Sequence, residues 1–192
     1  MDKGVHTRRE STMNPIQLVE EKASKIRLLI LDVDGVLTDG RIVLNELGEE
    51  SKYFHVRDGQ GLVLLMGAGV ETAVITGRRS KAVEYRAAEL GIKEIHQGVK
   101  DKESVCKEIL ERKGLERDQV CCIGDDLPDI PLFNLVGFPV AVADASGELL
   151  EAASYVTKNR GGNGAVREVC ELILNARGLW PRIISDFQRM GK

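Results

Sequence analysis

The sequence predicts an α/β protein with a doubly wound, Rossmann-like parallel sheet. Short apolar runs typical of buried strands alternate with helical stretches of roughly ten residues, which is the pattern of parallel strands joined by crossover helices. The first apolar run ends in two aspartates one residue apart, Asp32 and Asp34, and a glycine follows directly. Because ligands of open α/β sheets bind at the carboxyl ends of the strands, these carboxylates mark the expected site.

Each element is predicted from its own stretch of sequence. A short helix over 16–23 precedes the first strand, and apolar runs predict strands at 28–32, 71–75, 94–96, 120–123, 139–142 and 154–156. The helical stretches that alternate with these strands are predicted at 59–66, 80–90, 102–113, 128–135, 148–152 and 165–176.

One interval breaks the alternation. Strand-like runs at 41–44 and 51–55 flank turn residues at 45–49, which predicts a β-hairpin inserted after the first strand. The intervals that follow the first two sheet strands are too short for a second domain, so we expect no inserted domain over the site. Such a site stays open to solvent or is closed by another subunit, and this favours an oligomer.

Composition excludes several classes of protein. A chain of 192 residues with a formal net charge of −3 gives no electrostatic reason to expect a nucleic-acid partner. No apolar run approaches the roughly 20 residues of a membrane span, and the polar N-terminus lacks the apolar core of a secretory signal. The cysteines form no CxxC pair, so we expect reduced core residues and a cytoplasmic protein. They are Cys106, Cys121, Cys122 and Cys170.

The aspartate pair suggests the chemistry. Two carboxylates held close together repel each other, so Asp32 and Asp34 require a nearby cation or a shared proton. A hard divalent cation such as Mg²⁺, bound through one or two carboxylates together with a substrate phosphate, fits this pattern. One aspartate is then available as a nucleophile and the other as a general acid and base.

Four motifs resemble those of the haloacid dehalogenase superfamily of phosphatases and occur in the same order. They are DVDGVLTDG at 32–40, Thr76 in VITGR, Lys102 in GVKDKE, and GDDLPD at 124–129. One subgroup is similar over about residues 20–176: the capless 3-deoxy-D-manno-octulosonate 8-phosphate phosphatases. The segments that carry this closer resemblance are FHVRDGQG at 54–61, AVAD at 141–144 and GGNGAVRE at 161–168.

The resemblance implies a role for each motif residue. Asp32 is the expected nucleophile, which forms an aspartyl-phosphate, and Asp34 is the expected general acid and base. Asp125 completes a Mg²⁺ site with Asp32 and with Asp34, whose backbone carbonyl is implied to reach the metal. Thr76 is expected to donate a hydrogen bond to a phosphoryl oxygen, and Lys102 to supply positive charge to the same group.

Some assignments have alternatives. Lys100 is the rival of Lys102 for the lysine position. Asp126 and Asp129 either orient metal-bound water or cap the helix that begins near residue 128. The glycine-rich stretch 161–164 either cradles an anion at a helix entry or is an ordinary turn.

Substrate contacts are also implied by the resemblance. They are Asp34, His55, Val56, Arg57, Asp58, Gly59, Arg78, Arg86 and Lys102. The implied substrate is an eight- or nine-carbon keto-acid sugar phosphate, and arginine suits its carboxylate. As alternatives, Arg86 pairs with a neighbour such as Glu89, and His55 merely ends the hairpin.

Residues 16–176 are therefore expected to form a phosphatase domain, between a flexible N-terminal extension (1–15) and a C-terminal tail (177–192). The expected activity is Mg²⁺-dependent hydrolysis of 3-deoxy-D-manno-octulosonate 8-phosphate in lipopolysaccharide precursor synthesis, by a homotetramer. One alternative is a phosphatase for a nonulosonate 9-phosphate. Another is a non-catalytic oligomerisation module related to those on sugar-nucleotide synthetases, against which the complete set of motif residues counts.

Overall fold

The computed structural model describes residues 14–190, and a six-stranded parallel sheet lies at its centre. The strand order is β5-β4-β1-β6-β7-β8. The strands are β1 (Leu28–Leu31), β4 (Glu71–Thr76), β5 (Glu94–Gln97), β6 (Val120–Gly124), β7 (Phe138–Ala141) and β8 (Tyr155–Val156). All neighbouring strands run parallel, so the predicted doubly wound sheet is confirmed.

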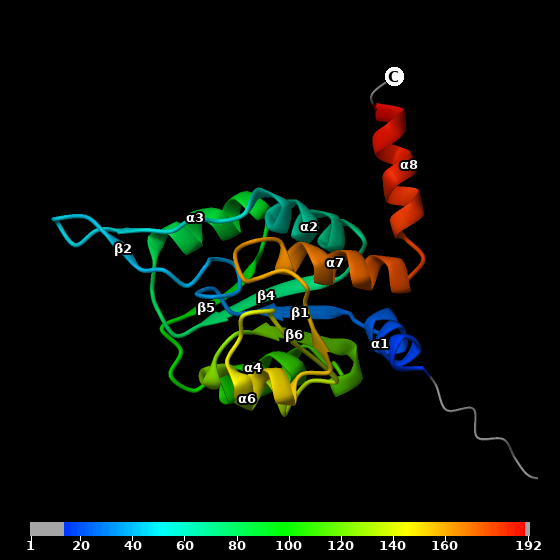
Figure 1. Ribbon diagram of the computed structural model, residues 1–192, viewed down its shortest axis with the longest axis horizontal. Coiled ribbons are helices and arrows are strands. Elements are labelled where there is room, and N and C mark those ends of the chain that lie inside the picture. Colours follow the sequence, from blue (N-terminus) through cyan, green and yellow to red (C-terminus); the bar gives the residue numbers. More distant parts are fainter. Residues whose placement is uncertain (1–13, 191–192) are drawn as a thin grey trace, which may run out of the picture.

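Helices cover both faces of this sheet (Figure 1). One face carries α1 (Pro15–Ser24), α2 (Val56–Gly67), α3 (Lys81–Leu90) and α7 (Ala165–Ala176). The other carries α4 (Lys102–Lys113), α5 (Ile130–Phe133) and α6 (Gly147–Ala152). Strand β1 shows why both faces are needed: Leu29 and Leu31 enter one apolar core, and Leu28 and Ile30 enter the other.

Helix α1 begins at Pro15, one residue before the predicted boundary of the folded part. Asn14 is its N-cap: the side chain accepts a hydrogen bond from the Ile16 N–H at 3.1 Å, and the Gln17 side-chain oxygen accepts one from the Asn14 N–H at 3.1 Å. Pro15 occupies the first turn, where its missing N–H costs nothing. Asn14 and Pro15 therefore belong to the helix, while residues 1–13 of the predicted extension lie outside the described residues.

Two predicted elements are shorter than the sequence suggested. The hairpin is present, but its strands are only β2 (Val43–Leu44) and β3 (Glu50–Ser51), so the prediction of strand over 41–42 and 52–55 was wrong. The predicted helix at 128–135 is a 3-10 turn, η2 (Leu127–Asp129), followed by the short α5. Pro131 lacks the N–H that a continuous helix would need at this point, which explains the break.

The chain ends in an unpredicted helix, α8 (Trp180–Met190), which projects away from the body (Figure 1). Pro181 stands at its start, where proline is tolerated. The exposed Ile184 and Phe187 lie on this helix. Within residues 14–190, no helix is both long enough and apolar enough to span a bilayer.

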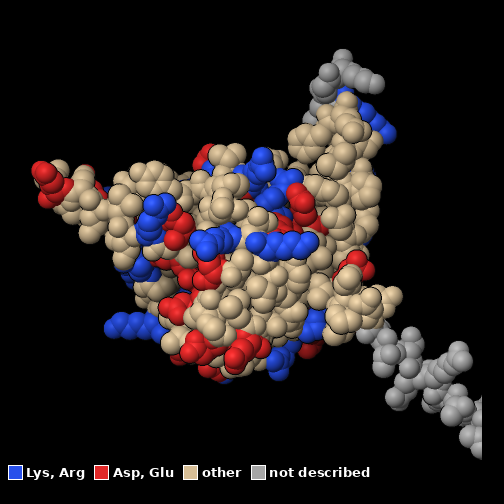
Figure 2. Space-filling view, in the orientation of Figure 1, with Lys and Arg blue, Asp and Glu red and all other residues tan. Residues whose placement is uncertain are grey.

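The remaining features of the fold are a short 3-10 turn, the surface charges, the cysteines and the stretch that holds the hairpin. A 3-10 turn, η1 (Arg117–Gln119), leads into β6. Acidic and basic side chains are interspersed on the face shown in Figure 2. All four cysteines are buried and free, as predicted. The stretch between β1 and α2 holds only the small hairpin and its turns, and no cap domain is inserted there.

Candidate active site

The carboxyl ends of three adjacent strands form one cleft of about 550 Å³. Strand β1 lies between β4 and β6, so Asp32, Thr76 and Asp125 meet at the same edge of the sheet. The sequence placed these side chains at strand ends, and the strand order brings them together. Charged residues that line the cleft are Asp32, Asp34, Arg78, Lys100, Asp101, Lys102, Asp125, Asp126 and Asp129.

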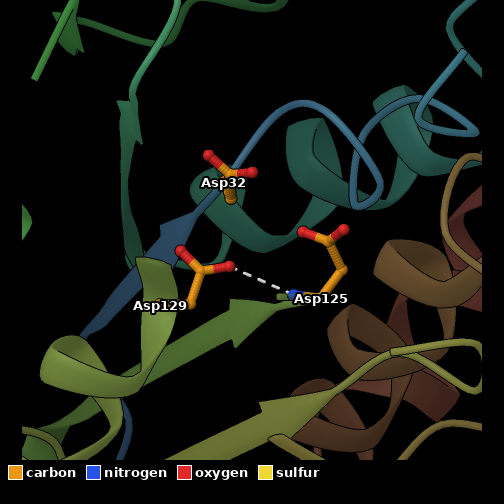
Figure 3. Close-up of side chains that lie close together, drawn as sticks. All are labelled: Asp32, Asp125 and Asp129. Carbon is orange, nitrogen blue, oxygen red and sulfur yellow. Dashed lines mark hydrogen bonds between the residues drawn. The ribbon is translucent and has the colours of Figure 1, made fainter. Parts of the chain in front are cut away.

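Three carboxylates converge in this cleft (Figure 3). One oxygen each from Asp32, Asp125 and Asp129 lie within 4.8 Å of one another. Asp129 is committed to other partners, because its Oδ1 accepts a hydrogen bond from Lys102 at 2.7 Å and its Oδ2 one from the Asp125 N–H at 3.1 Å. Asp126 caps η2 through the Leu127 N–H. Asp32 and Asp125 are thus better placed than Asp129 to hold a cation. Asp129 is placed to orient Lys102 and the Asp125 backbone through its hydrogen bonds.

Lys102 neutralises part of this negative charge. Its side chain is 6% exposed, and its Nζ donates to Asp32 Oδ1 at 2.8 Å and to Asp129 Oδ1 at 2.7 Å. Lys102 is the first residue of α4, and Asp101 caps that helix by accepting the Ser104 N–H. Lys100 lies exposed at the edge of the cleft. The geometry therefore favours Lys102 over its rival.

Asp34 faces the same cleft from the turn after β1. Its carboxylate is separate from the three-carboxylate group, and its Oδ1 accepts a hydrogen bond from Lys52. The Arg78 Nε lies 3.5 Å from Asp34 Oδ2. Gly35 makes the turn possible: its φ is +91°, and a Cβ there would lie 2.0 Å from Asp125 Oδ2.

Comparison with known proteins identifies the family. The profile of haloacid dehalogenase-like hydrolases matches residues 91–169. The 3-deoxy-D-manno-octulosonate 8-phosphate phosphatase KdsC of Escherichia coli (strain B / BL21-DE3) is 50% identical over 160 residues, which cover 83% of this chain and 85% of the relative. This chain belongs to the 3-deoxy-D-manno-octulosonate 8-phosphate phosphatase family. The family lies within the haloacid dehalogenase-like hydrolases, as the motifs predicted.

Solved structures of this phosphatase family have the same fold. The Moraxella catarrhalis phosphatase, in complex with magnesium, phosphate and KDO, is 43% identical with a TM-score of 0.87 and covers 89% of this chain and 98% of its own. The cobalt-bound Haemophilus influenzae phosphatase is 43% identical with a TM-score of 0.79, and the match covers 82% of this chain and 92% of that phosphatase.

The shifted pKa values of the carboxyl groups in the cleft favour a bound cation. Burial, together with the neighbouring carboxylates, raises the pKa of Asp125 to about 8. Burial and the nearby Asp129 raise the pKa of Asp32 to about 6, against the opposing effect of Lys102. Burial alone would lower the pKa of Lys102, but Asp32 and Asp129 outweigh it and raise that pKa. The carboxyl group of Asp125 is therefore costly to ionise unless a cation lies beside it.

These shifts predict a link between pH, metal and stability. A carboxyl whose pKa is raised on folding stabilises the fold below its ordinary pKa, and this stability is lost as the pH rises through the folded-state value. For Asp125 the window runs from the ordinary pKa of 3.8 to about 8. In chelator, the melting temperature should fall more steeply over this window in the wild type than in Asp125→Asn. Added Mg²⁺ should raise the wild-type melting temperature more at pH 8 than at pH 6.

Thermal scans with EDTA or MgCl₂ across this pH range measure both effects. Equal pH slopes for wild type and Asp125→Asn, with no response to Mg²⁺, would contradict the placement of a cation beside Asp125.

The predicted substrate contacts at 55–59 lie outside this cleft. Of the described residues that line it, none comes from that segment. His55 and Arg57 instead line a second groove of about 440 Å³, together with Asn163 and Arg167. Asp58 is buried and accepts hydrogen bonds from the Arg167 N–H at 2.7 Å and from the Gly164 N–H at 3.2 Å. Its carboxylate holds α2 against α7, while Val56 is exposed at the start of α2.

Arg86 also lies apart from the cleft. Its Nη1 donates to Glu89 Oε2 at 2.8 Å, which is the pairing that the sequence left open. Its guanidinium packs on Gly59, where a Cβ would lie 2.1 Å from Nη2. Arg78, in contrast, lines the cleft directly and pairs with Glu50.

The glycine-rich stretch at the entry of α7 supports the turn after β1. A Cβ on Gly161 would lie 1.6 Å from the Gly35 carbonyl oxygen, so only glycine fits this contact. The Gly162 N–H donates to the Val36 carbonyl at 2.9 Å, and the Gly161 N–H to Asp144 at 3.0 Å. These contacts favour the turn interpretation over an anion cradle.

Sequence reasoning missed one residue of the site. Lys52 reaches the Asp34 carboxylate from the hairpin, and its side chain is only 2% exposed. A lysine in a short polar hairpin ordinarily lies in solvent, so the sequence around Lys52 does not indicate a buried residue of the site. Only the folding of the hairpin onto the turn after β1 brings the two groups together.

Proposed function

We propose that the chain is a Mg²⁺-dependent phosphatase that hydrolyses 3-deoxy-D-manno-octulosonate 8-phosphate to the free sugar acid and phosphate. The observation that carries this proposal is the meeting of Asp32, Asp125 and Lys102 in one cleft, with Asp34 facing it. The identity of 50% with KdsC over most of both chains supports the substrate. The product belongs to lipopolysaccharide precursor synthesis.

Asp32 is the proposed nucleophile. Its carboxylate attacks phosphorus, the bond from phosphorus to the sugar oxygen breaks, and an aspartyl-phosphate forms. Asp34 protonates the departing sugar oxygen and then takes a proton from the water that releases phosphate. Thr76 and Lys102 stabilise the charge on the phosphoryl oxygens, since both line the same cleft.

Asp32 and Asp125 are proposed to hold Mg²⁺, together with the backbone carbonyl of Asp34. The donor set fits, because carboxylate and carbonyl oxygens suit this hard cation, and the three clustered carboxylates outnumber the single ammonium of Lys102 that contacts them. When bound, Mg²⁺ reduces the repulsion between the Asp32 carboxylate and the substrate phosphate. Asp129 orients the group through Lys102 and the Asp125 N–H.

A homotetramer is proposed to complete the site. The segment 55–59 and Arg86 lie apart from the cleft within one chain, so a neighbouring subunit is a natural route for bringing them to the substrate. The hairpin, which projects at the left of Figure 1, exposes apolar side chains that an interface would cover. These are Ile42, Leu44, Leu47 and Tyr53. Sedimentation equilibrium of the full chain should give four times the chain mass; a stable monomer with full activity would contradict this assembly.

The four free, buried cysteines support a reducing compartment, so we infer that the protein works in the cytoplasm.

A substrate panel tests the proposed activity. Phosphate release is measured from 3-deoxy-D-manno-octulosonate 8-phosphate, a nonulosonate 9-phosphate and hexose phosphates, each with Mg²⁺ and with chelator. We expect the highest kcat/KM with the eight-carbon acid, and loss of activity in chelator. Equal or better turnover of the nine-carbon acid would reassign the substrate, and no turnover of any compound would favour the non-catalytic module.

A further inference from the structure

The hairpin contributes an ordered ring of charges beside Asp34. Lys52 donates to Asp34 Oδ1, and its Nζ also lies 3.5 Å from Glu50 Oε1. Arg78 donates to the same Glu50 oxygen, and its Nε lies 3.5 Å from Asp34 Oδ2. Negative and positive groups thus alternate around the ring.

Burial distinguishes Lys52 from ordinary hairpin lysines. Its side chain is 2% exposed, while the side chains of its partners Asp34 and Glu50 are 21% and 14% exposed. A buried ammonium is costly unless it is paired and hydrogen-bonded, so the contact with Asp34 fixes both side chains. The lysine is too enclosed to serve as a direct substrate contact.

Lys52 contacts the Asp34 side of the site and not the three-carboxylate group of Asp32, Asp125 and Asp129. Among the described residues, Lys102 rather than Lys52 contacts Asp32 and Asp129, whereas Lys52 pairs with Asp34 and Glu50. A change at Lys52 should therefore leave the nucleophile and the cation site in place. Its effect should fall on the Asp34 carboxylate, which is the proposed proton donor to the departing oxygen.

We propose that Lys52 is a positioning residue, which holds the Asp34 carboxylate in the orientation from which it serves the leaving oxygen. Glu50 holds Lys52, so the hairpin is part of the catalytic support. This inference rests on the proposed function, because it assigns Asp34 the role of general acid.

The dependence of rate on the leaving group tests this role. A sugar alkoxide needs protonation as it departs, whereas 4-nitrophenolate leaves without it. In Lys52→Met, which keeps much of the bulk and removes the charge, we expect kcat for the sugar phosphate to fall about 100-fold, within the range of acid catalysis. With 4-nitrophenyl phosphate we expect kcat to change less than about threefold, and phenyl phosphate to fall between them.

Two further variants separate positioning from general damage. Lys52→Arg keeps a cation and should recover most of the rate on the sugar phosphate. Lys107→Met is the matched control, since Lys107 is 53% exposed and pairs with Glu103 on the same helix; it should match the wild type. If Lys52→Met fails to fold, the double variant Lys52→Met/Glu50→Gln is tested instead. The second substitution removes the Glu50 charge that the loss of Lys52 leaves without this partner.

The outcomes are distinct. Equal losses on all three substrates, or no loss on any, would overturn the positioning role. Inactivity of the wild type towards the eight-carbon substrate would instead overturn the proposed function, and the aryl phosphate comparison would still report on Lys52.

Discussion

Asp32→Asn is expected to lower kcat by about 10⁴-fold or more, because the amide cannot attack phosphorus. The change is nearly isosteric and removes a carboxyl whose pKa burial raises to about 6, so the fold should survive. Lys102 retains its bond to Asp129 in this variant. Steady-state phosphate release measures the loss, and thermal unfolding should shift by no more than about 5 °C.

Asp126→Asn is the matched control for this change. Asp126 also lines the cleft, but its side chain caps η2 and it lies outside the three-carboxylate group. We expect a loss of less than about tenfold, because the asparagine oxygen can accept the same Leu127 N–H and caps a helix about as well as aspartate. Turnover by Asp32→Asn at the wild-type rate would remove Asp32 from the role of nucleophile.

Lys102→Met is expected to damage both stability and catalysis. The buried ammonium bonds two carboxylates, and its removal leaves Asp32 and Asp129 without their cation. Breaking a buried pair in this way costs about 3–5 kcal/mol, which corresponds to a fall in melting temperature of roughly 10 °C for a chain of this size. Loss of the charge beside the phosphoryl group should lower kcat by about 10²–10³-fold.

Saturating Mg²⁺ should recover part of the stability of Lys102→Met but little of its activity, since a cation at Asp125 does not replace the ammonium at Asp129. Lys100→Met, the rival position at the edge of the cleft, should stay within about threefold of the wild type in kcat. If Lys100→Met proved the more damaging of the two substitutions, the lysine role would pass to Lys100.

Much of the sheet and of the site was predictable from local sequence. Thr76 ends an apolar strand, and Asp32 and Asp125 each directly follow one. Parallel strands present such residues at one edge of the sheet. Lys102 follows the same logic, because Asp101 caps α4 and fixes where the helix begins. These positions depend on short-range patterns, which a sequence displays directly.

Other features depend on contacts between distant segments. Lys52 becomes buried only because the hairpin folds onto Asp34, 18 residues away. Asp129 combines a place in the η2 turn with a bond to Lys102, and local sequence could not decide between capping and support of the site. Helix α8 lies in the stretch predicted as a C-terminal tail, because the family resemblance covers only about residues 20–176 and gives no pattern for the segment beyond.

Capture of the phosphoryl-enzyme tests the central claim, that phosphoryl transfer passes through Asp32. Wild-type enzyme is mixed with Mg²⁺ and 3-deoxy-D-manno-octulosonate 8-phosphate, quenched in acid within one turnover, and reduced with borohydride, which converts an aspartyl-phosphate to homoserine. Peptide mass spectrometry should find homoserine at position 32, only when substrate and Mg²⁺ are both present. Efficient turnover with an unmodified Asp32, or with the label on another residue, would contradict the account.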